Sequence, residues 1–261
     1  MMSGFETHEQ YYGRLAVAED VDVRTGETMR SHVYGFENVD DSTVCIAEIP
    51  AIGAAFGFVA SGAVTVWDHV NTADGFILRT QRWFALPLGG RLHLHPGTRV
   101  VVSQREGFRG VRAFGGPIEP RGRLRYIDGC SDSLLCGPPL LGDPCLNHLH
   151  FPPGIEQTFH DHPSVRSGVV ARGSGWCETP EGRVPLRAGM VWIIQAGQVH
   201  RFITTSDKLD VVAYHPDSDW GPTDEEHPMV NRTWVDGRKV DNTTEAHLGA
   251  DVYGRSALTG D

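Results

Sequence analysis

Short runs of β-branched and aromatic residues, separated by glycine, proline, asparagine or aspartate, recur along most of this 261-residue chain. Thr98-Arg-Val-Val-Val-Ser and Leu209-Asp-Val-Val-Ala-Tyr are examples. Runs of this length and composition are typical of strands, and the 31 glycines and 16 prolines supply turns between them. Hydrophobic residues make up 40% of the chain, which is enough for a full core. The sequence therefore predicts an all-β sandwich or barrel.

The charge balance argues against a nucleic-acid partner. Asp and Glu number 33 against 23 Lys and Arg, which gives a formal charge of −10, whereas phosphate binding needs a basic face. The five cysteines show no CxxC spacing, and an odd number argues against a disulfide framework. The N-terminus lacks the apolar region of a signal peptide, and no apolar run approaches the about 18 residues of a membrane helix. We expect a cytoplasmic protein that binds neither nucleic acid nor membrane.

Composition divides the chain into four parts. Residues 1–42 are polar and mixed, and we expect an N-terminal arm there. Strand patterns begin near residue 43, weaken into turn-rich sequence between 105 and 145, and then resume. We therefore expect a first barrel-like half at 43–135, a second at 136–240, and a flexible tail or linker at 241–261.

A faint internal repeat relates the two halves. Leu94-His-Pro-Gly97 aligns with Leu186-Arg-Ala-Gly189, and the run from Arg82 to Gly89 aligns with that from Arg166 to Gly173. The first copy has Phe76, Leu78 and Phe108 where the second has His160, His162 and His200. We expect a duplication in which only the second copy binds a metal.

Three histidines in the second half have the spacing of a metal site. His160 and His162 are one residue apart, so on a strand both would point to the same face. His200 would come from a neighbouring strand. Neutral imidazole is the commonest metal ligand, and three imidazoles leave coordination positions open for substrate or water.

The positions around these histidines resemble the two motifs of the cupin superfamily. Seven positions match: Gly154, His160, His162, Gly173, Gly189, Gly197 and His200. Three depart, with Arg166 in the place of glutamate, Gln195 in that of proline and Thr204 in that of asparagine. The resemblance covers roughly residues 146–216 and implies a double-stranded β-helix, a small jelly-roll barrel. Since many cupins carry two copies, we expect a bicupin with a degenerate N-terminal barrel.

Arg166 stands where the resemblance places a fourth, acidic ligand. Arginine cannot ligate a cation, because it is not deprotonated in proteins. The expected cofactor is one divalent metal ion, iron or zinc with manganese as a further option, held by His160, His162 and His200. Arg166 could bind a substrate carboxylate through two parallel hydrogen bonds, or it could form a salt bridge at the rim with Asp161 or Glu156.

Further polar residues are candidates for substrate binding. Gln157 could donate a hydrogen bond to a ligand, and His150 and His215 could line the barrel. His148 and His150 share one face of a strand, so they could instead support the ligands from outside or belong to the barrel wall. The turn-rich segments 125–133 and 215–228 could contribute contacts at the barrel mouth.

We expect a metal-dependent enzyme that acts on a small, carboxylate-bearing, amino-acid-like metabolite. The first hypothesis is dioxygenase-type chemistry at a three-histidine iron centre. The second is a redox-neutral zinc or manganese enzyme, either an isomerase or lyase, or a catalyst of N–N bond formation. The run from His148 to Gly175 resembles the cupin part of hydrazine-forming synthetases, which implies a separate or downstream synthetase-like partner. The third is a non-catalytic binding cupin. A homodimer is also expected.

Overall fold

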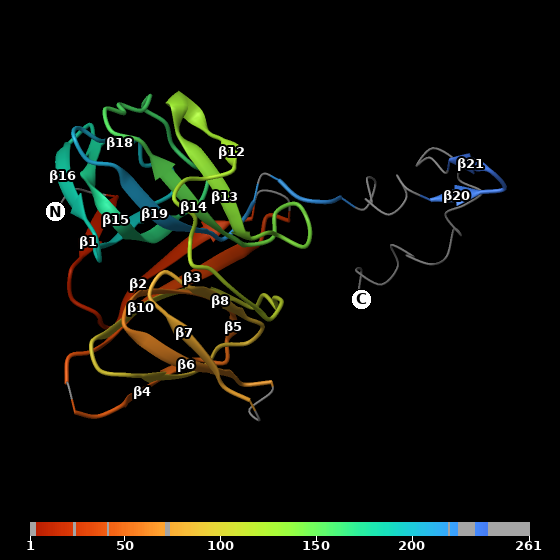
Figure 1. Ribbon diagram of the computed structural model, residues 1–261. Helices are drawn as coiled ribbons and strands as arrows, with labels where there is room; N and C mark the ends of the chain where they lie inside the picture. Colours follow the sequence, from red (N-terminus) through yellow and green to blue (C-terminus); the bar gives the residue numbers. More distant parts are fainter. Residues whose placement is uncertain are drawn as a thin grey trace.

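The computed structural model describes residues 4–22, 25–40, 42–70, 74–218, 220–223 and 233–239 (Figure 1). The regular structure within these ranges consists of strands and one short 3₁₀ turn, η1 (Ile127–Gly129). This confirms the predicted all-β fold. Among these residues, no helix is long and apolar enough to cross a membrane.

Two sheets build the N-terminal half. The first has six strands in the order β11-β8-β5-β10-β3-β2, and the second has four in the order β4-β9-β6-β7. The strands of the first are β2 (Tyr12–Val21), β3 (Thr28–Asn38), β5 (Gly53–Ser61), β8 (Trp83–Leu86), β10 (Thr98–Glu106) and β11 (Ala113–Gly115). Those of the second are β4 (Cys45–Ile49), β6 (Ala63–Asp68), β7 (Phe76–Arg79) and β9 (Gly90–Leu94).

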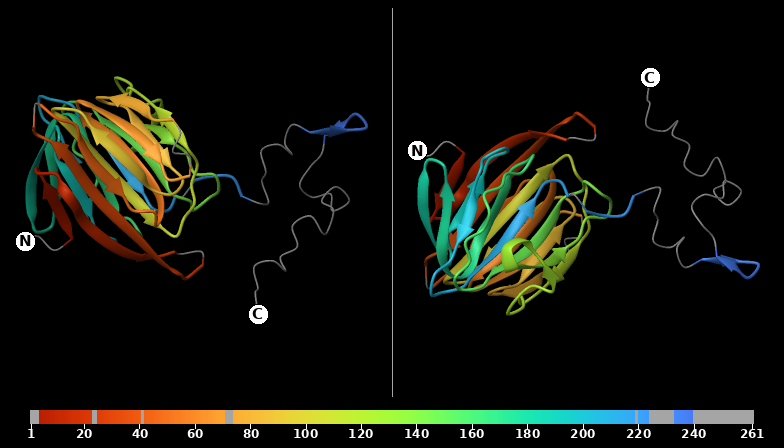
Figure 2. Two further views of the ribbon diagram at one scale, coloured as in Figure 1. Left: turned by 90° about the horizontal axis from the view of Figure 1, so that it is seen from below. Right: turned by 90° about the horizontal axis from the view of Figure 1, so that it is seen from above.

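One nine-stranded sheet builds the C-terminal half. Its main order is β1-β17-β15-β19-β14-β13-β12, and β16 and β18 pair with the far end of the long strand β15. The strands are β1 (Phe5–His8), β12 (Leu124–Arg125), β13 (Ser131–Cys136), β14 (Cys145–Phe151), β15 (Arg166–Thr179), β16 (Gly182–Arg187), β17 (Val191–Ile194), β18 (Arg201–Ile203) and β19 (Leu209–His215). Figure 2 shows the N-terminal half in front on the left and the C-terminal half in front on the right.

The sheets divide the chain differently from the composition. Residues 1–42, expected as an arm, contribute β1 to the C-terminal sheet and β2 and β3 to the six-stranded sheet. β2 is an edge strand whose exposed residues are both apolar and charged, so its sequence does not separate an inner from an outer face. β12 and β13 lie before the predicted boundary at 135/136 and nevertheless pair within the C-terminal half.

The structure also shows the outcome for three other segments, one without the strand expected from the sequence, one with the expected hairpin and one outside the described residues. The run from Gln157 to His162 is not a strand, and β15 begins only at Arg166. The predicted hairpin near residues 232–240 is present as β20 (Trp234–Val235) paired with β21 (Arg238–Lys239). The predicted tail at 241–261 lies outside the described residues.

Each half has its own apolar interior. The N-terminal interior is filled by aliphatic and aromatic side chains from both of its sheets, among them Val66, Leu92 and Val100, all fully buried. The C-terminal interior is also apolar over most of its length, with Phe151, Trp192 and Leu209 at its centre. The described side chains of the N-terminal interior are thus closely packed.

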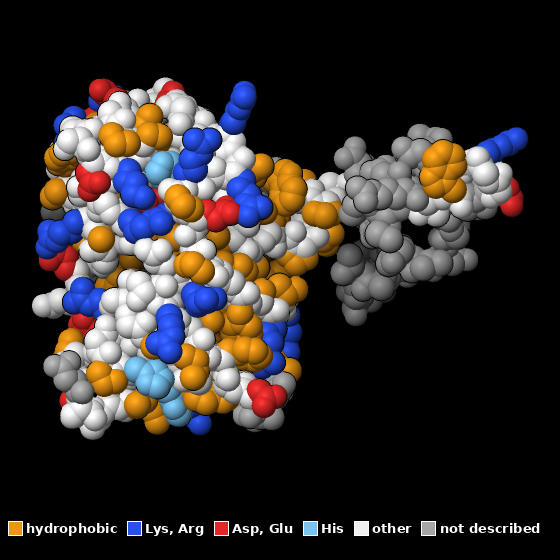
Figure 3. All heavy atoms as spheres, in the orientation of Figure 1, with side chains coloured by type: hydrophobic (Ala, Val, Ile, Leu, Met, Phe, Trp, Pro, Cys, Tyr) orange, Lys and Arg blue, Asp and Glu red, His pale blue; other side chains and the backbone are white. Residues whose placement is uncertain are grey.

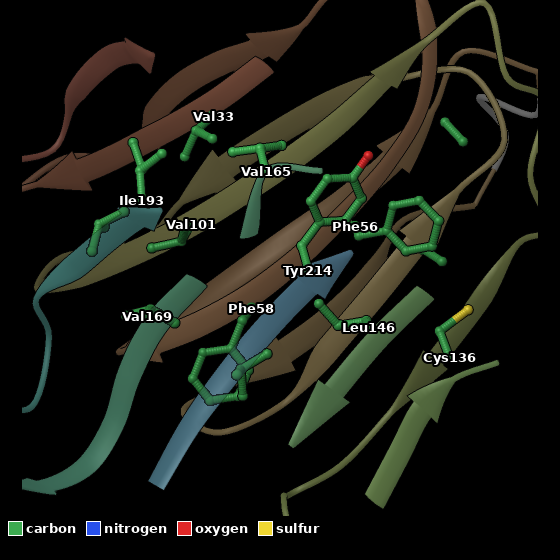
Figure 4. Packing of buried hydrophobic residues seen from close by; sticks show 14 of the residues in the cluster. Val33, Phe56, Phe58, Val101, Cys136, Leu146, Val165, Val169, Ile193 and Tyr214 are labelled. Atoms are coloured by element: carbon green, nitrogen blue, oxygen red, sulfur yellow. The ribbon is translucent and has the colours of Figure 1, made fainter. Parts of the chain in front are cut away.

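A third cluster joins the two halves (Figure 4). Phe56, Phe58 and Val101 from the six-stranded sheet pack against Val169 and Tyr214 from the C-terminal sheet. Within this layer the hydroxyls of Ser103 and Ser167 lie 2.9 Å apart and form a buried hydrogen bond. The C-terminal sheet is therefore covered on both faces, which fixes the strands that carry the candidate site.

The outer surface mixes charges. On the face shown in Figure 3, Lys and Arg side chains are scattered over both halves among acidic and apolar ones, and they form no single continuous basic surface there.

The layer between the halves should govern global stability. Phe58 is 2% exposed in this layer, so Phe58→Ala should lower the free energy of unfolding by about 3–5 kcal/mol through lost contacts and a residual cavity. Urea denaturation followed by intrinsic fluorescence measures this change. The matched control Tyr12→Ala, at a site 66% exposed, should stay within about 0.5 kcal/mol of wild type. A similar small effect for Phe58→Ala would contradict the assigned interface.

Candidate metal centre

The structure brings His160, His162 and His200 together. Each offers one ring nitrogen, and the three nitrogens lie within 4.8 Å of one another. The cause is a backbone bridge: His160 N–H donates to the His200 carbonyl over 3.0 Å, and His200 N–H donates to the His160 carbonyl over 2.8 Å. The prediction that the His160-x-His162 pair lies on a strand was wrong. An irregular segment held by this bridge brings the rings together instead.

Hydrogen bonds orient two of the three imidazoles. Nδ1 of His160 lies 2.9 Å from the Thr158 carbonyl, and Nδ1 of His200 lies 2.9 Å from the Gln198 carbonyl. A carbonyl oxygen can only accept, so each Nδ1 must carry the proton. Both rings therefore keep the Nε2 lone pair free, which is the tautomer that a metal needs.

Burial keeps the imidazoles of His162 and His200 neutral. It lowers the pKa of His162 to about 3, with further contributions from the positive charge of Arg166 and from the other two histidines. It also lowers the pKa of His200 to about 4, partly opposed by the hydrogen bond to Gln198. Neutral nitrogen ligands need no deprotonation before they bind a cation. The donor set therefore fits a divalent metal.

The histidines border a cavity of about 20 Å³ inside the C-terminal half. This volume holds one water molecule or one ion. Apolar side chains form most of the wall: Leu149, Phe151, Trp192, Ile194, Phe202 and Ala213. Tyr126 also lines the cavity.

Arg166 lines this cavity and is only 4% exposed. Its Nη1 donates to the Ser164 hydroxyl and to Oδ1 of Asp217, 3.2 Å away. Its Nε is buried with no hydrogen-bond partner among the described residues. The alternative of a rim salt bridge was wrong, because Arg166 is buried and Glu156 pairs instead with Arg201. Nη1 of the guanidinium thus pairs with Asp217, whereas Nε has no partner in the described part of the chain and Arg166 lines the cavity.

The remaining predicted residues occupy three different environments. His215 lines the cavity next to His162, with ring centroids 6.5 Å apart, and burial followed by the charge of Arg166 holds its pKa well below the usual value. Gln157 also lines the cavity, but its amide already donates to Cys130 Sγ and accepts from the Phe202 N–H. His150 does not line the cavity. Side chains alternate along β14, so Leu149 and Phe151 face inward and His150 faces outward.

On that outward face His148 and His150 share a buried carboxylate. Oδ1 of Asp210 lies 2.9 Å from His148 Nε2 and 2.7 Å from His150 Nδ1, and Oδ2 accepts from Arg172 and Lys208. Burial would raise the pKa of Asp210, but the two histidine hydrogen bonds and the two cations outweigh it and hold that pKa below its usual range. This cluster lies on the outward face of the sheet and not at the cavity.

Comparison with known proteins identifies the fold. Residues 147–215 match the family model described as a cupin domain. A cupin 2 conserved barrel domain protein from Leptotrichia buccalis superposes with a TM-score of 0.54 at 9% identity, covering 80% of this chain and 95% of that one. This chain has the cupin fold.

Two further cupin-like structures are similar at comparable distance. A putative glyoxylate-induced protein from Pseudomonas aeruginosa gives a TM-score of 0.52 at 12% identity, with 85% of this chain and 92% of that chain covered. Salicylate 1,2-dioxygenase from Pseudoaminobacter salicylatoxidans gives 0.51 at 10% identity, with 72% and 68% covered. The search of curated proteins found no significant match. These likenesses establish the cupin fold, while the duplication and the link to hydrazine-forming synthetases stay predictions.

Segment 125–133, expected at the barrel mouth, contains η1, and its support of the cupin domain's histidines was not predicted. Asp128 accepts the backbone N–H of Thr158 over 2.7 Å, and the Thr158 carbonyl in turn accepts Nδ1–H of His160. Asp128 adopts a left-handed conformation with φ of 54°, which is strained for a residue other than glycine. The Asp128-Gly129 pair signalled a turn, but nothing local to it indicated a contact with residue 158.

This chain of contacts predicts that Asp128 supports metal affinity. In Asp128→Gly the carboxylate is lost while the left-handed turn becomes easier, so zinc affinity should fall about tenfold without a loss of folding stability. Competition with a chromophoric chelator measures the affinity. The control Asp128→Asn keeps both an acceptor and tolerance of this conformation, and it should lose less. Equal affinity in Asp128→Gly and wild type would show that His160 needs no such support.

Proposed function

We propose that this cupin is a metal-dependent enzyme acting on a small, carboxylate-bearing, amino-acid-like metabolite, with His160, His162 and His200 as ligands. The observation that carries the proposal is the set of three clustered imidazoles, one buried and two half-buried, with no carboxylate in the same group among the described residues. Such a set leaves several positions on a divalent ion open to a chelating substrate.

The charge of the site favours an anionic ligand. Three neutral imidazoles leave the full double charge of a divalent metal uncompensated. The charge of Arg166 is balanced by Asp217, 3.2 Å away. A buried positive centre of this kind is stabilised when a carboxylate enters.

Two hydrogen-bond donors without partners in the described part of the chain also favour an anionic ligand. Arg166 Nε and Trp192 Nε1 are both buried without a hydrogen-bond partner among the described residues, and both side chains line the cavity. Each unpaired donor costs free energy that a ligand oxygen would recover. We propose that they bind the substrate carboxylate while the apolar wall excludes water.

Dioxygenase-type chemistry is the first candidate. A divalent metal held by these ligands would supply open coordination positions and Lewis acidity, and iron would add redox activity. One similar structure is a salicylate 1,2-dioxygenase, which gives this candidate a precedent on the same fold. The chain's own contribution is to hold the substrate carboxylate and to keep the centre dry.

The position of His215 favours a redox-neutral alternative. Its neutral imidazole lies beside His162 and lines the cavity, with no hydrogen bond to another described residue, so its ring nitrogens are available to a substrate group that exchanges a proton. Isomerisation, lyase chemistry and hydrazine-forming rearrangement all require such proton transfers. Only the hydrazine-forming rearrangement needs a synthetase-like partner. A non-catalytic binding cupin, the third candidate, has no need of a metal site open to substrate.

Metal identity and oxygen consumption separate these candidates. Protein purified without chelators should contain about one divalent metal per chain, and His160→Ala should lose most of it. Elemental analysis and an oxygen electrode with a panel of small carboxylates measure the two properties. Iron with substrate-dependent oxygen uptake supports the dioxygenase, and stoichiometric zinc without uptake supports the redox-neutral enzyme. A metal content unchanged in His160→Ala would overturn the proposed ligand set.

A further inference from the structure

Two polar residues, Asp132 and Asn147, lie on the inner face of the cupin barrel. Asp132 pairs with Leu149 across β13 and β14, and Asn147 pairs with Ala213 across β14 and β19. Directly paired residues point to the same face of a sheet, and both Leu149 and Ala213 line the cavity. Asp132 and Asn147 therefore lie on the same face as these two residues, next to the cavity lining but not part of it.

This pair has hydrogen-bonding capacity that the protein does not use. Asn147 donates from Nδ2 to Oδ2 of Asp132 over 3.0 Å. The remaining acceptors, Oδ1 of Asp132 and Oδ1 of Asn147, are both buried and have no donor among the described residues. Asn147 as a whole is only 7% exposed. Two adjacent buried acceptors without donors are costly unless a ligand or water satisfies them.

Asp210, a buried carboxylate in the same sheet, does not lack hydrogen-bond donors in this way. Asp210 is buried on the opposite face with four donors around its two oxygens. Asp132 has one side-chain donor and no salt bridge among the described residues. Burial accordingly raises the pKa of Asp132, whereas the pKa of Asp210 is held below its usual range. Asp132 is the carboxylate that lacks a cation.

Tyr126 connects this pair to the cavity. Its ring lines the cavity, and burial followed by the negative charge of Asp132 raises its pKa to about 12, while Arg166 acts in the opposite direction. The Tyr126 side chain is therefore affected by two opposite charges: the Asp132 carboxylate on β13 and the Arg166 guanidinium on β15. The interior is polarised, with unused acceptors on one wall and unused donors on the other.

We propose that Asp132 and Asn147 bind a protonated amino group of the substrate, at the opposite end from the carboxylate held near Arg166 and Trp192. This subsite rests on the proposed function and narrows its substrate to a zwitterion with separated amino and carboxylate groups. An ammonium group has three donors, enough to satisfy both free acceptors and the charge of Asp132. A site built to hydrogen-bond such a group rejects analogues that lack it, because its acceptors would then stay unpaired.

The test uses zinc-loaded full-length protein and two matched probe series. One series is glycine, β-alanine, 4-aminobutyrate and 5-aminopentanoate, and the other is acetate, propionate, butyrate and pentanoate. Calorimetry should show at least one chain length at which the amino acid binds about tenfold more tightly than its partner acid. In Asp132→Asn this preference should disappear while affinity for zinc and for the plain acids stays unchanged.

Thermal unfolding of the ligand-free variants provides an independent readout. Asp132→Asn should unfold at the same or a higher temperature than wild type, because it removes an unpaired buried charge. The matched control Asp210→Asn should unfold at a lower temperature, because its carboxylate is needed by four neighbours. Lower stability in Asp132→Asn, or no amino preference at any length in wild type, would show that the pair holds structural water only. If wild type binds no zinc at all, the proposed function fails instead.

Discussion

Two backbone hydrogen bonds between His160 and His200 are the interaction on which the candidate site depends. They join two segments forty residues apart and place both imidazoles, with His162, around one point. Backbone bonds restrict the rings more tightly than side-chain contacts could, because they fix the Cα positions from which the imidazoles project. The Nδ1 hydrogen bonds to Thr158 and Gln198 then set the ring orientation. Ligand geometry is thus prepared by the irregular segment and not by a strand.

The rest of the cupin fold holds this bridge in place. The C-terminal sheet is packed from within by its own apolar cluster and from outside by the N-terminal half. The N-terminal interior is filled with apolar side chains throughout, so that half acts as a support. Polar groups on the inner face of the C-terminal sheet are consequently confined to a few positions, and several of those keep unused donors or acceptors.

The barrel and the histidine trio could be predicted from sequence because both depend on local patterns. Strand propensity, turn residues and motif spacing are all properties of short segments. The rest depends on contacts between distant segments. Arg166 was expected to use its whole guanidinium on a substrate or a rim carboxylate, but its partner is Asp217, 51 positions away. His150 was expected in the cavity, and one step of strand register turns it to the other face. β2 was assigned to an arm because it is an edge strand that exposes apolar as well as polar residues, among them Tyr12 and Val17.

The central claim is that three histidines, and no acidic side chain, provide the protein ligands of a divalent metal in this cupin. X-ray absorption spectroscopy of zinc-loaded protein measures this most directly, since imidazole rings give a characteristic multiple-scattering signal. The account predicts three imidazoles per zinc in wild type and two in His200→Gln, with the other positions filled by oxygen from solvent. Fewer than three imidazoles in wild type, or no change in His200→Gln, would contradict it.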